Sequence, residues 1–339
     1  MPSKFETLGD HEVTDLNRPE DGPRSAHRWS PEQKAALTLA QAARRPLLVR
    51  GEPGTGKTQL ARAAAQVLGW RLLTEVIHPR FEAQDLIYRH DAIRRLADAQ
   101  PGGKLGENSD YWEPGVLWRA YGWESAKDYG SCAQETTTPA GHVILIDEID
   151  KADSDLPNSL LEVLGQRSFR IPELNVPIQA LPDSANAPLV IITTNEEREL
   201  PPAFLRRCVV LNLAPKPGQS YLSWLKQRAT AHFGDDRPVA AASPPAPKLA
   251  PEVIDIAARQ LDADRTAAGS AGYKPGAAEL LDLLYALHQL APDDTPRQID
   301  YLQRLSAFVF VKHGGLDDSQ PLPGQDRSPV PVIDGAAKS

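Results

Sequence analysis

The stretch Gly51-Glu52-Pro53-Gly54-Thr55-Gly56-Lys57-Thr58 decides which fold this sequence predicts. In its pattern, G-x-x-x-x-G-K-[ST], glycine-rich backbone curls around phosphate oxygens, the lysine contacts the terminal phosphates and the Thr58 hydroxyl ligates magnesium. The apolar run 47–49 precedes the stretch, and a helical run, 59–68, follows it. A strand that delivers the loop and a helix that leaves it aim successive N–H groups at one polyphosphate. The sequence therefore predicts a site for a nucleoside triphosphate and Mg²⁺, with candidate contacts Gly51, Glu52, Pro53, Gly54, Thr55, Gly56, Lys57, Thr58 and Gln59.

Carboxylates follow a second strand-like run. Residues 142–146 are mostly apolar β-formers and lead directly into Asp147 and Glu148. In an open parallel sheet, ligands lie at the carboxyl ends of the strands. There Asp147 would orient magnesium or its water shell, and Glu148 would accept a proton from the water that attacks the γ-phosphate. Another buried strand, 188–194, ends at Asn195. Such an asparagine is often a turn residue, but we favour a role in positioning the water because Asn195 would share the sheet edge with Glu148.

Length and composition limit the classes of protein to which the chain can belong. At 339 residues the chain is long enough for two domains of about 100–200 residues each. A net charge of −8 counts against a general nucleic-acid binder. No apolar run reaches the ~20 residues that span a bilayer, and the N-terminus lacks a signal-peptide profile. The two cysteines, Cys132 and Cys208, have no ligand-like spacing and suit a reducing compartment. We therefore expect a cytoplasmic protein without membrane insertion.

The first two thirds of the chain alternate between strand and helix patterns. Residues 1–27 are polar and lack apolar periodicity, so we expect a flexible arm. Residues 28–215 are expected to form an α/β nucleotide-binding core, whose spacing of strand, helix and strand favours a parallel sheet. Its strands are expected at 47–49, 71–77, 142–146, 188–194 and 208–211.

A long segment, 79–141, interrupts this core and carries structure of its own. Its aromatic run, 111–121, is either a surface that binds a partner or a small core packed under a loop, and core packing is the simpler interpretation. Residues 168–178 are expected to form a hairpin.

The last third is helical. We expect a second domain at 216–313, interrupted by a mobile Pro/Ala-rich loop at 237–251, and a disordered tail at 314–339. Just before this domain, a short helix ends at the adjacent residues Arg206 and Arg207. If exposed, these arginines could reach the phosphates of a neighbouring subunit.

With these motifs assembled, residues 28–313 resemble the AAA+ ATPases, within them the MoxR-like and dynein-related branch that includes McrB. Gly51 to Thr58 is similar to the Walker A loop of that family, Val143 to Glu148 to its Walker B strand, and Asn195 to its sensor 1. Arg207 aligns with the arginine finger, and Arg206 beside it is a second candidate. Arg297, in Asp-Thr-Pro-Arg-Gln, is similar to the sensor 2 arginine.

The resemblance implies a P-loop NTPase fold: an αβα sandwich with a parallel five-stranded sheet and a C-terminal helical lid. It also implies a homo-oligomeric ring, usually hexameric, with ATP at the subunit interfaces and a neighbour's arginine completing each site. MoxR-like members typically act as chaperones that remodel partner proteins, often ones with a von Willebrand factor A domain.

Three functions stay open on the sequence. The first is an ATP-hydrolysing ring that remodels a separately encoded protein. The second is a nucleotide-controlled switch for assembly or signalling, in which hydrolysis is slow. The third is a McrB-like nucleic-acid motor, which the acidic charge balance counts against. A small-molecule kinase is a weaker alternative, because it would need an acceptor pocket and a cluster of lid arginines, but not the Asp147-Glu148 pair, Asn195 and the interface arginines together. Intact Glu148, Asn195 and Arg207 favour the first.

Overall fold

The structure is a computed structural model, and the chain divides into two compact units with the boundary between Lys216 and Pro217. The expected disordered tail, 314–339, and most of the expected mobile loop, 237–251, lie outside the residues that the structure describes. The described residues are 3–10, 12–16, 25–100, 103, 106–153, 155–171, 174, 176–179, 187–234, 247–268 and 273–310.

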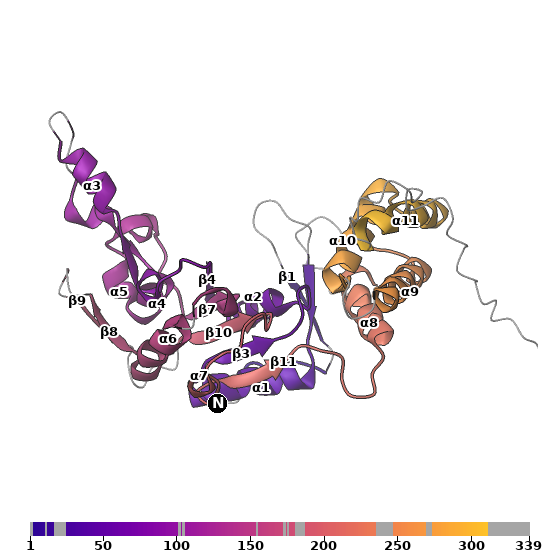
Figure 1. The fold of residues 1–339 in the computed structure, drawn as a ribbon, viewed down its shortest axis with the longest axis horizontal. Coiled ribbons are helices and arrows are strands. Elements are labelled where there is room, and N and C mark those ends of the chain that lie inside the picture. The colour runs from indigo at the N-terminus through magenta and orange to yellow at the C-terminus, as the bar shows by residue number, and fades with distance from the viewer. Residues whose placement is uncertain are drawn as a thin grey trace, which may run out of the picture. The chain divides into compact units, whose positions relative to one another are not determined.

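A parallel five-stranded sheet organises the first unit, in the order β11-β3-β10-β7-β4 (Figure 1). All four neighbouring pairs are parallel, as the alternation of strand and helix patterns predicts. The runs rich in Val, Ile and Leu are buried on both faces, which is the pattern of a strand with helices on either side. The strands are β3 (Leu47–Arg50), β4 (Arg71–Val76), β7 (His142–Asp147), β10 (Leu189–Thr194) and β11 (Val209–Asn212).

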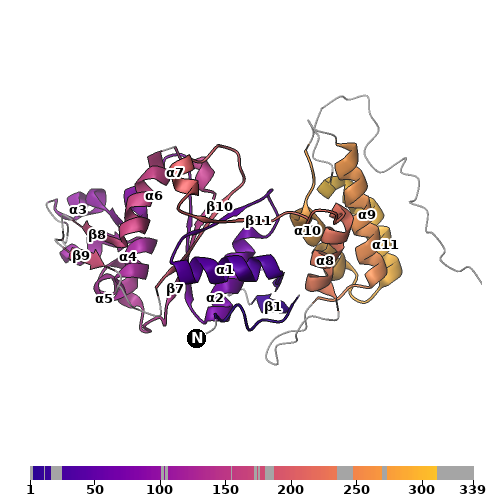
Figure 2. The ribbon, with the colours of Figure 1, turned by 90° about the horizontal axis from the view of Figure 1, so that it is seen from below.

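Helices cover both faces of this sheet (Figure 2). On one face α1 (Pro31–Ala43) and α2 (Lys57–Leu68) form a core with inward residues of β3, β7 and β10. On the other face α4 (Val116–Tyr121), α6 (Asp155–Gln166) and α7 (Pro202–Leu205) pack against the alternate residues of the same strands. The result is the expected three-layer αβα sandwich.

The N-terminal segment differs from the expected flexible arm. Strand β1 (Val13–Leu16) pairs antiparallel with β2 (Ser25–Arg28). The Phe5 side chain is fully buried, with its ring centroid 6.0 Å from that of Trp29, and Lys4 Nζ donates to the Leu68 carbonyl at 2.8 Å. The prediction was therefore wrong for the described part of residues 1–27. The apolar residues of this segment are isolated and irregularly spaced, so they show no periodicity although they fill the core beside α1 and α2.

The segment 79–141 builds a small core of its own. Its aromatic residues are buried with Ile171 and Ile178 of the neighbouring hairpin, which confirms the interpretation as core packing. That hairpin, expected at 168–178, consists of β8 (Ser168–Ile171) and β9 (Val176–Gln179). The elements of the segment are η1 (Ala83–Leu86), β5 (Tyr88–His90), α3 (Ala92–Asp98), η2 (Asn108–Tyr111), β6 (Trp112–Pro114), α5 (Trp123–Ala126) and η3 (Gly130–Gln134).

Helices make up the described part of the second unit, as predicted. They enclose an apolar core that includes Leu225, Val253, Leu284 and Phe310. Their bounds are α8 (Tyr221–Phe233), α9 (Pro251–Ala267), α10 (Ala277–Leu290) and α11 (Thr295–Phe310). Among the described residues of the chain, no helix is both long enough and apolar enough to cross a membrane.

Replacing Phe5 by Ala tests the packing of the N-terminal segment. Because the side chain is fully buried, the Phe5→Ala variant is expected to lose about 3–5 kcal/mol of unfolding free energy, as measured by urea unfolding followed by tryptophan fluorescence. Phe308, which is 74% exposed, provides the matched control, and Phe308→Ala should change stability by less than about 0.5 kcal/mol. Equal urea midpoints for Phe5→Ala and Phe308→Ala would show that the N-terminal segment does not pack on the core.

Candidate nucleotide-binding site

The loop between β3 and α2 has a backbone that only glycine adopts easily. Gly54 and Gly56 have φ values of 75° and 86°, and Gly51 has 152°. A Cβ atom at Gly51 would lie 2.8 Å from the Leu213 carbonyl oxygen, which leaves no room for a side chain. Gly56 is the N-cap of α2 and supplies no side-chain acceptor, so the first N–H groups of the helix are available to an anion. The loop therefore fits a phosphate chain.

Lys57 places a cation inside this loop. Its side chain is only 7% exposed, and its Nζ donates to the carbonyl oxygens of Gly51 at 2.7 Å and Glu52 at 3.0 Å. A third bond reaches Asn195 Oδ1 at 2.7 Å. Burial lowers the pKa of Lys57 below its ordinary value, while the negative charge of Asp147 opposes this shift. An ammonium held by carbonyl-type oxygens can exchange them for phosphate oxygens, which accept stronger hydrogen bonds.

Asp147 joins three elements at the end of β7. One carboxylate oxygen accepts a hydrogen bond from Thr58 Oγ1 at 2.9 Å, and the other accepts one from the hydroxyl of Thr193, which is fully buried in β10. Mg²⁺ is usually held by one or two protein oxygens together with phosphates and waters. Among the described residues there is no cluster of three or more acidic, His or Cys ligands. The adjacent hydroxyl and carboxylate of Thr58 and Asp147 fit such an open magnesium site.

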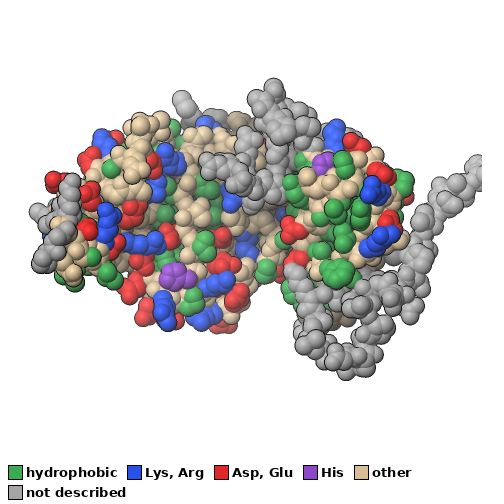
Figure 3. Space-filling model, turned by 90° about the horizontal axis from the view of Figure 1, so that it is seen from above, with side chains coloured by type: hydrophobic (Ala, Val, Ile, Leu, Met, Phe, Trp, Pro, Cys, Tyr) green, Lys and Arg blue, Asp and Glu red, His purple; other side chains and the backbone are tan. Residues whose placement is uncertain are grey.

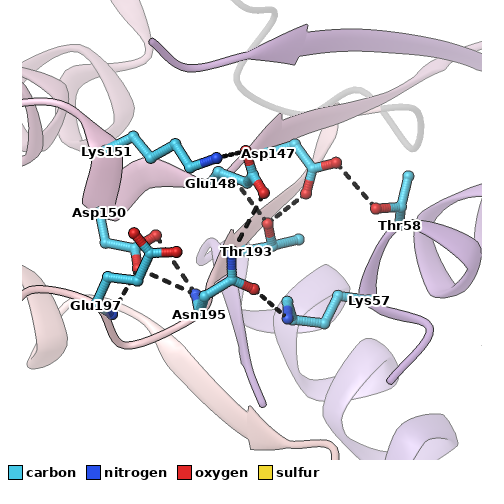
Figure 4. A network of polar contacts seen from close by, with 9 residues as sticks. All are labelled: Lys57, Thr58, Asp147, Glu148, Asp150, Lys151, Thr193, Asn195 and Glu197. Atoms are coloured by element: carbon cyan, nitrogen blue, oxygen red, sulfur yellow. Dashed lines mark hydrogen bonds and ion pairs between the residues drawn. The ribbon is translucent and has the colours of Figure 1, made fainter. Parts of the chain in front are cut away.

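Glu148 turns away from the strand at the next position. Its backbone is left-handed, with φ 62° and ψ 49°, and its N–H donates to Thr193 Oγ1 at 2.9 Å. Its side-chain oxygens have separate partners: Oε1 accepts from Asn195 Nδ2 at 3.3 Å, and Oε2 lies 2.7 Å from Lys151 Nζ (Figure 4). Lys151 belongs to the short helix η4 (Ile149–Lys151). The Glu148 side chain is 30% exposed, so water can reach it.

Asn195 connects the carboxylate to the phosphate loop. Its amide nitrogen donates to Glu148 while its amide oxygen accepts from Lys57, so its side chain is part of the polar network. Asp150 holds the backbone of Asn195 in place. Asp150 is only 2% exposed, and its carboxylate accepts hydrogen bonds from the backbone N–H groups of Asn195 at 3.2 Å and Glu197 at 2.9 Å (Figure 4).

Sequence reasoning missed three residues of this network: Asp150, Lys151 and Thr193. A usable signal existed for Asp150, which continues the acidic run that begins at Asp147. Thr193 is one of several β-branched residues in its strand, and nothing in the local sequence sets it apart.

Two of the predicted arginines, Arg206 and Arg207, lie away from this network. Arg206 and Arg207 are exposed and precede the amino end of β11, which pairs with the amino end of β3. The phosphate loop leaves the carboxyl end of β3, so the sheet separates these arginines from the loop of their own subunit. Arg45 Nη2 donates to the Arg206 carbonyl oxygen at 3.0 Å. Arg297 lies in the second unit, with its guanidinium carbon 5.7 Å from the centroid of the Tyr301 ring.

The match to one family of known domains agrees with this geometry. Residues 46–208 match the AAA domain of the dynein-related subfamily. Midasin from Giardia intestinalis is 28% identical over 203 residues, a stretch that covers 57% of this chain and 3% of midasin. The Thermotoga maritima RuvB Holliday junction branch migration motor aligns with a TM-score of 0.40 and 14% identity, covering 81% of this chain and 67% of that one. A mutant of RuvB aligns with a TM-score of 0.41 and 15% identity, covering 81% and 68%.

The chain thus spans a small part of midasin. The matched range 46–208 contains the phosphate loop, the acidic end of β7 and Asn195. This range of the chain is similar to the AAA domains of the dynein-related subfamily, a family of ATPases.

Proposed function

We propose that the protein hydrolyses ATP at the interfaces of a homo-oligomeric, hexameric ring and uses hydrolysis to remodel or activate a partner protein, as MoxR-like chaperones do. The observation that carries the proposal is the continuous network from Lys57 through Asn195 to Glu148. It joins a phosphate-binding cation to a water-accessible carboxylate, which is what hydrolysis of a phosphoanhydride requires.

Each group of the network has a role in this proposal. The backbone from Gly51 to Gln59 would hold the triphosphate, and Thr58 and Asp147 would hold Mg²⁺, which when bound neutralises charge on the phosphate oxygens. Glu148 would orient the attacking water and accept its proton, while Asn195 would hold the carboxylate in the orientation that faces the water. Arg297 would act as sensor 2 from the helical lid, a role that rests on the resemblance.

The position of Arg206 and Arg207 supports action on a neighbouring subunit. They precede the amino end of β11, whereas the nucleotide site lies at the carboxyl ends of the strands. A head-to-tail association would bring the arginines of one copy to the site of the next, and repeated head-to-tail contacts close into a ring. Charge favours this arrangement, because the turn after β10 exposes three glutamates beside the site, Glu196, Glu197 and Glu199, against one arginine, Arg198.

The partner protein rests on the resemblance to MoxR-like chaperones, and a protein with a von Willebrand factor A domain is the first candidate. The β8–β9 hairpin is the surface we propose for contact with it. A nucleic-acid motor is disfavoured by the net charge of −8. On the face drawn in Figure 3, the Lys and Arg side chains of the described residues alternate with Asp and Glu and form no continuous basic surface.

The remaining alternatives have less support. A switch with slow hydrolysis could dispense with a water-accessible Glu148 held by Asn195. A small-molecule kinase would need an acceptor pocket at the phosphate loop. The pocket of about 470 Å³ beside β4, lined by residues including Arg71, Glu75, Arg89 and Arg119, contains none of the network residues.

Replacing Glu148 by Gln tests the hydrolytic role. Because a positioned base contributes about 10²–10⁴-fold, the Glu148→Gln variant should lose at least 100-fold in phosphate release while retaining bound ATP. Light scattering should then detect a ring that forms only with ATP. Glu124→Gln is the matched control, because Glu124 also pairs with a lysine three residues along the chain but belongs to the segment 79–141, outside the network. Unimpaired turnover in Glu148→Gln would exclude Glu148 as the base.

Mixing two inactive variants tests the shared site. Lys57→Ala should abolish nucleotide binding, and Arg207→Ala should leave binding intact but stop hydrolysis. A mixture contains interfaces that combine an intact phosphate loop from one subunit with an intact Arg207 from the other. ATPase activity should therefore reappear on mixing, with a maximum at intermediate ratios. The same titration with Arg206→Ala identifies which arginine acts. Mixtures that stay inactive at every ratio would mean that Arg207 does not act across an interface.

A further inference from the structure

Lys151 contacts the proposed base but has no role in the mechanism described above. It follows Glu148 by three residues, and the two side chains are linked through η4 by the 2.7 Å ion pair. The hydrogen bond to Glu148 raises the pKa of Lys151 above its ordinary value, so the ammonium stays charged at neutral pH. Figure 4 shows Lys151 reaching the carboxylate from the side of the network away from Thr58.

The ion pair restricts what the Glu148 carboxylate can do. Asn195 already occupies Oε1, and Lys151 occupies Oε2. Charge-assisted hydrogen bonds are short and directional, so the ammonium both fixes the rotamer of the carboxylate and competes with water for its lone pairs. A base that must aim water at a phosphate needs one oxygen free to turn toward it.

A second lysine of the chain shows that the pair geometry is ordinary. Lys127 Nζ lies 2.6 Å from Glu124 Oε2 at the same i,i+3 spacing, on the surface of the segment 79–141. The two ion pairs differ in the further contacts of the glutamate. Glu148 is tied through Asn195 to Lys57, so the phosphate lysine, the amide and the base form one chain of contacts that ends at Lys151.

We propose that Lys151 is a positioning residue that restrains Glu148 and thereby limits the basal rate of hydrolysis. This inference rests on the proposed function, because it assigns Lys151 a role through the base of that reaction. When Lys57 turns toward a phosphate, its hydrogen bond to Asn195 breaks. The Asn195 side chain is then free to move together with the Glu148 carboxylate. The contact with Lys151 then remains as the last restraint on the carboxylate.

Turnover of the full chain tests the restraint. Surface ion pairs contribute up to about 1 kcal/mol, so the Lys151→Met variant is expected to raise kcat about 2–5-fold with KM unchanged. Lys151→Arg keeps the charge and should stay near the wild type. Lys127→Met removes the matched pair elsewhere and should leave kcat unchanged. Raising the salt concentration screens the pair, so kcat of the wild type should approach that of Lys151→Met.

Two further measurements separate this role from a structural one. In a Glu148→Gln background, Lys151→Met should have no additional effect on turnover. Without nucleotide, the ¹⁵N signal of the Lys151 ammonium, assigned by its loss in Lys151→Arg, should shift in Glu148→Gln.

Circular dichroism should show that Lys151→Met is folded. A folded Lys151→Met with unchanged or lower kcat would overturn the restraint, as would an unshifted ammonium signal. A wild-type protein that hydrolyses no ATP in any assembly would instead contradict the proposed function. The role proposed for Lys151 would then also be wrong.

Discussion

The carboxylate of Asp147 accepts hydrogen bonds from two hydroxyl groups, and the rest of the site depends on this junction. Thr193 binds it from the neighbouring strand, and Thr58 binds it from the helix that leaves the phosphate loop. Hydrogen bonds to a charged acceptor are strong and directional. A shift of β10 by one residue would turn the Thr193 hydroxyl to the other face of the sheet. The pairing of two strands and the position of the loop therefore meet at one side chain.

The parallel sheet explains why the remaining groups meet. Every strand presents its carboxyl end at the same edge, so residues far apart in the sequence become neighbours without long side chains. Thr193 also accepts the N–H of Glu148, which sets the left-handed turn that directs this residue toward Asn195. Asp150 then holds Asn195 through its backbone. The result is a network in which short side chains are positioned by the main chain.

The parts of the fold that could be predicted are those whose sequence has a periodic apolar pattern or a motif. Buried strands, amphipathic helices and the loop at 51–58 follow from periodicity and from a motif with a mechanism. The packing of Phe5 was missed because isolated apolar residues have no period, and their partners lie far along the chain. Asp150 and Lys151 were missed for another reason: Asp150 continues an acidic run, but the roles of both residues depend on two turns, where Asn195 and Glu148 adopt positions that no local pattern encodes.

Helix α2 is held at both of its ends. Its amino end begins at Lys57 in the phosphate loop, and the last carbonyl of its carboxyl end, on Leu68, accepts a hydrogen bond from Lys4. A cation at that end also complements the helix dipole. Because a helix is stiff along its axis, a displacement at the loop is carried to the segment that holds Phe5. A fluorescent reporter attached near Ser3 would therefore sense events at the phosphate loop from the opposite end of the helix.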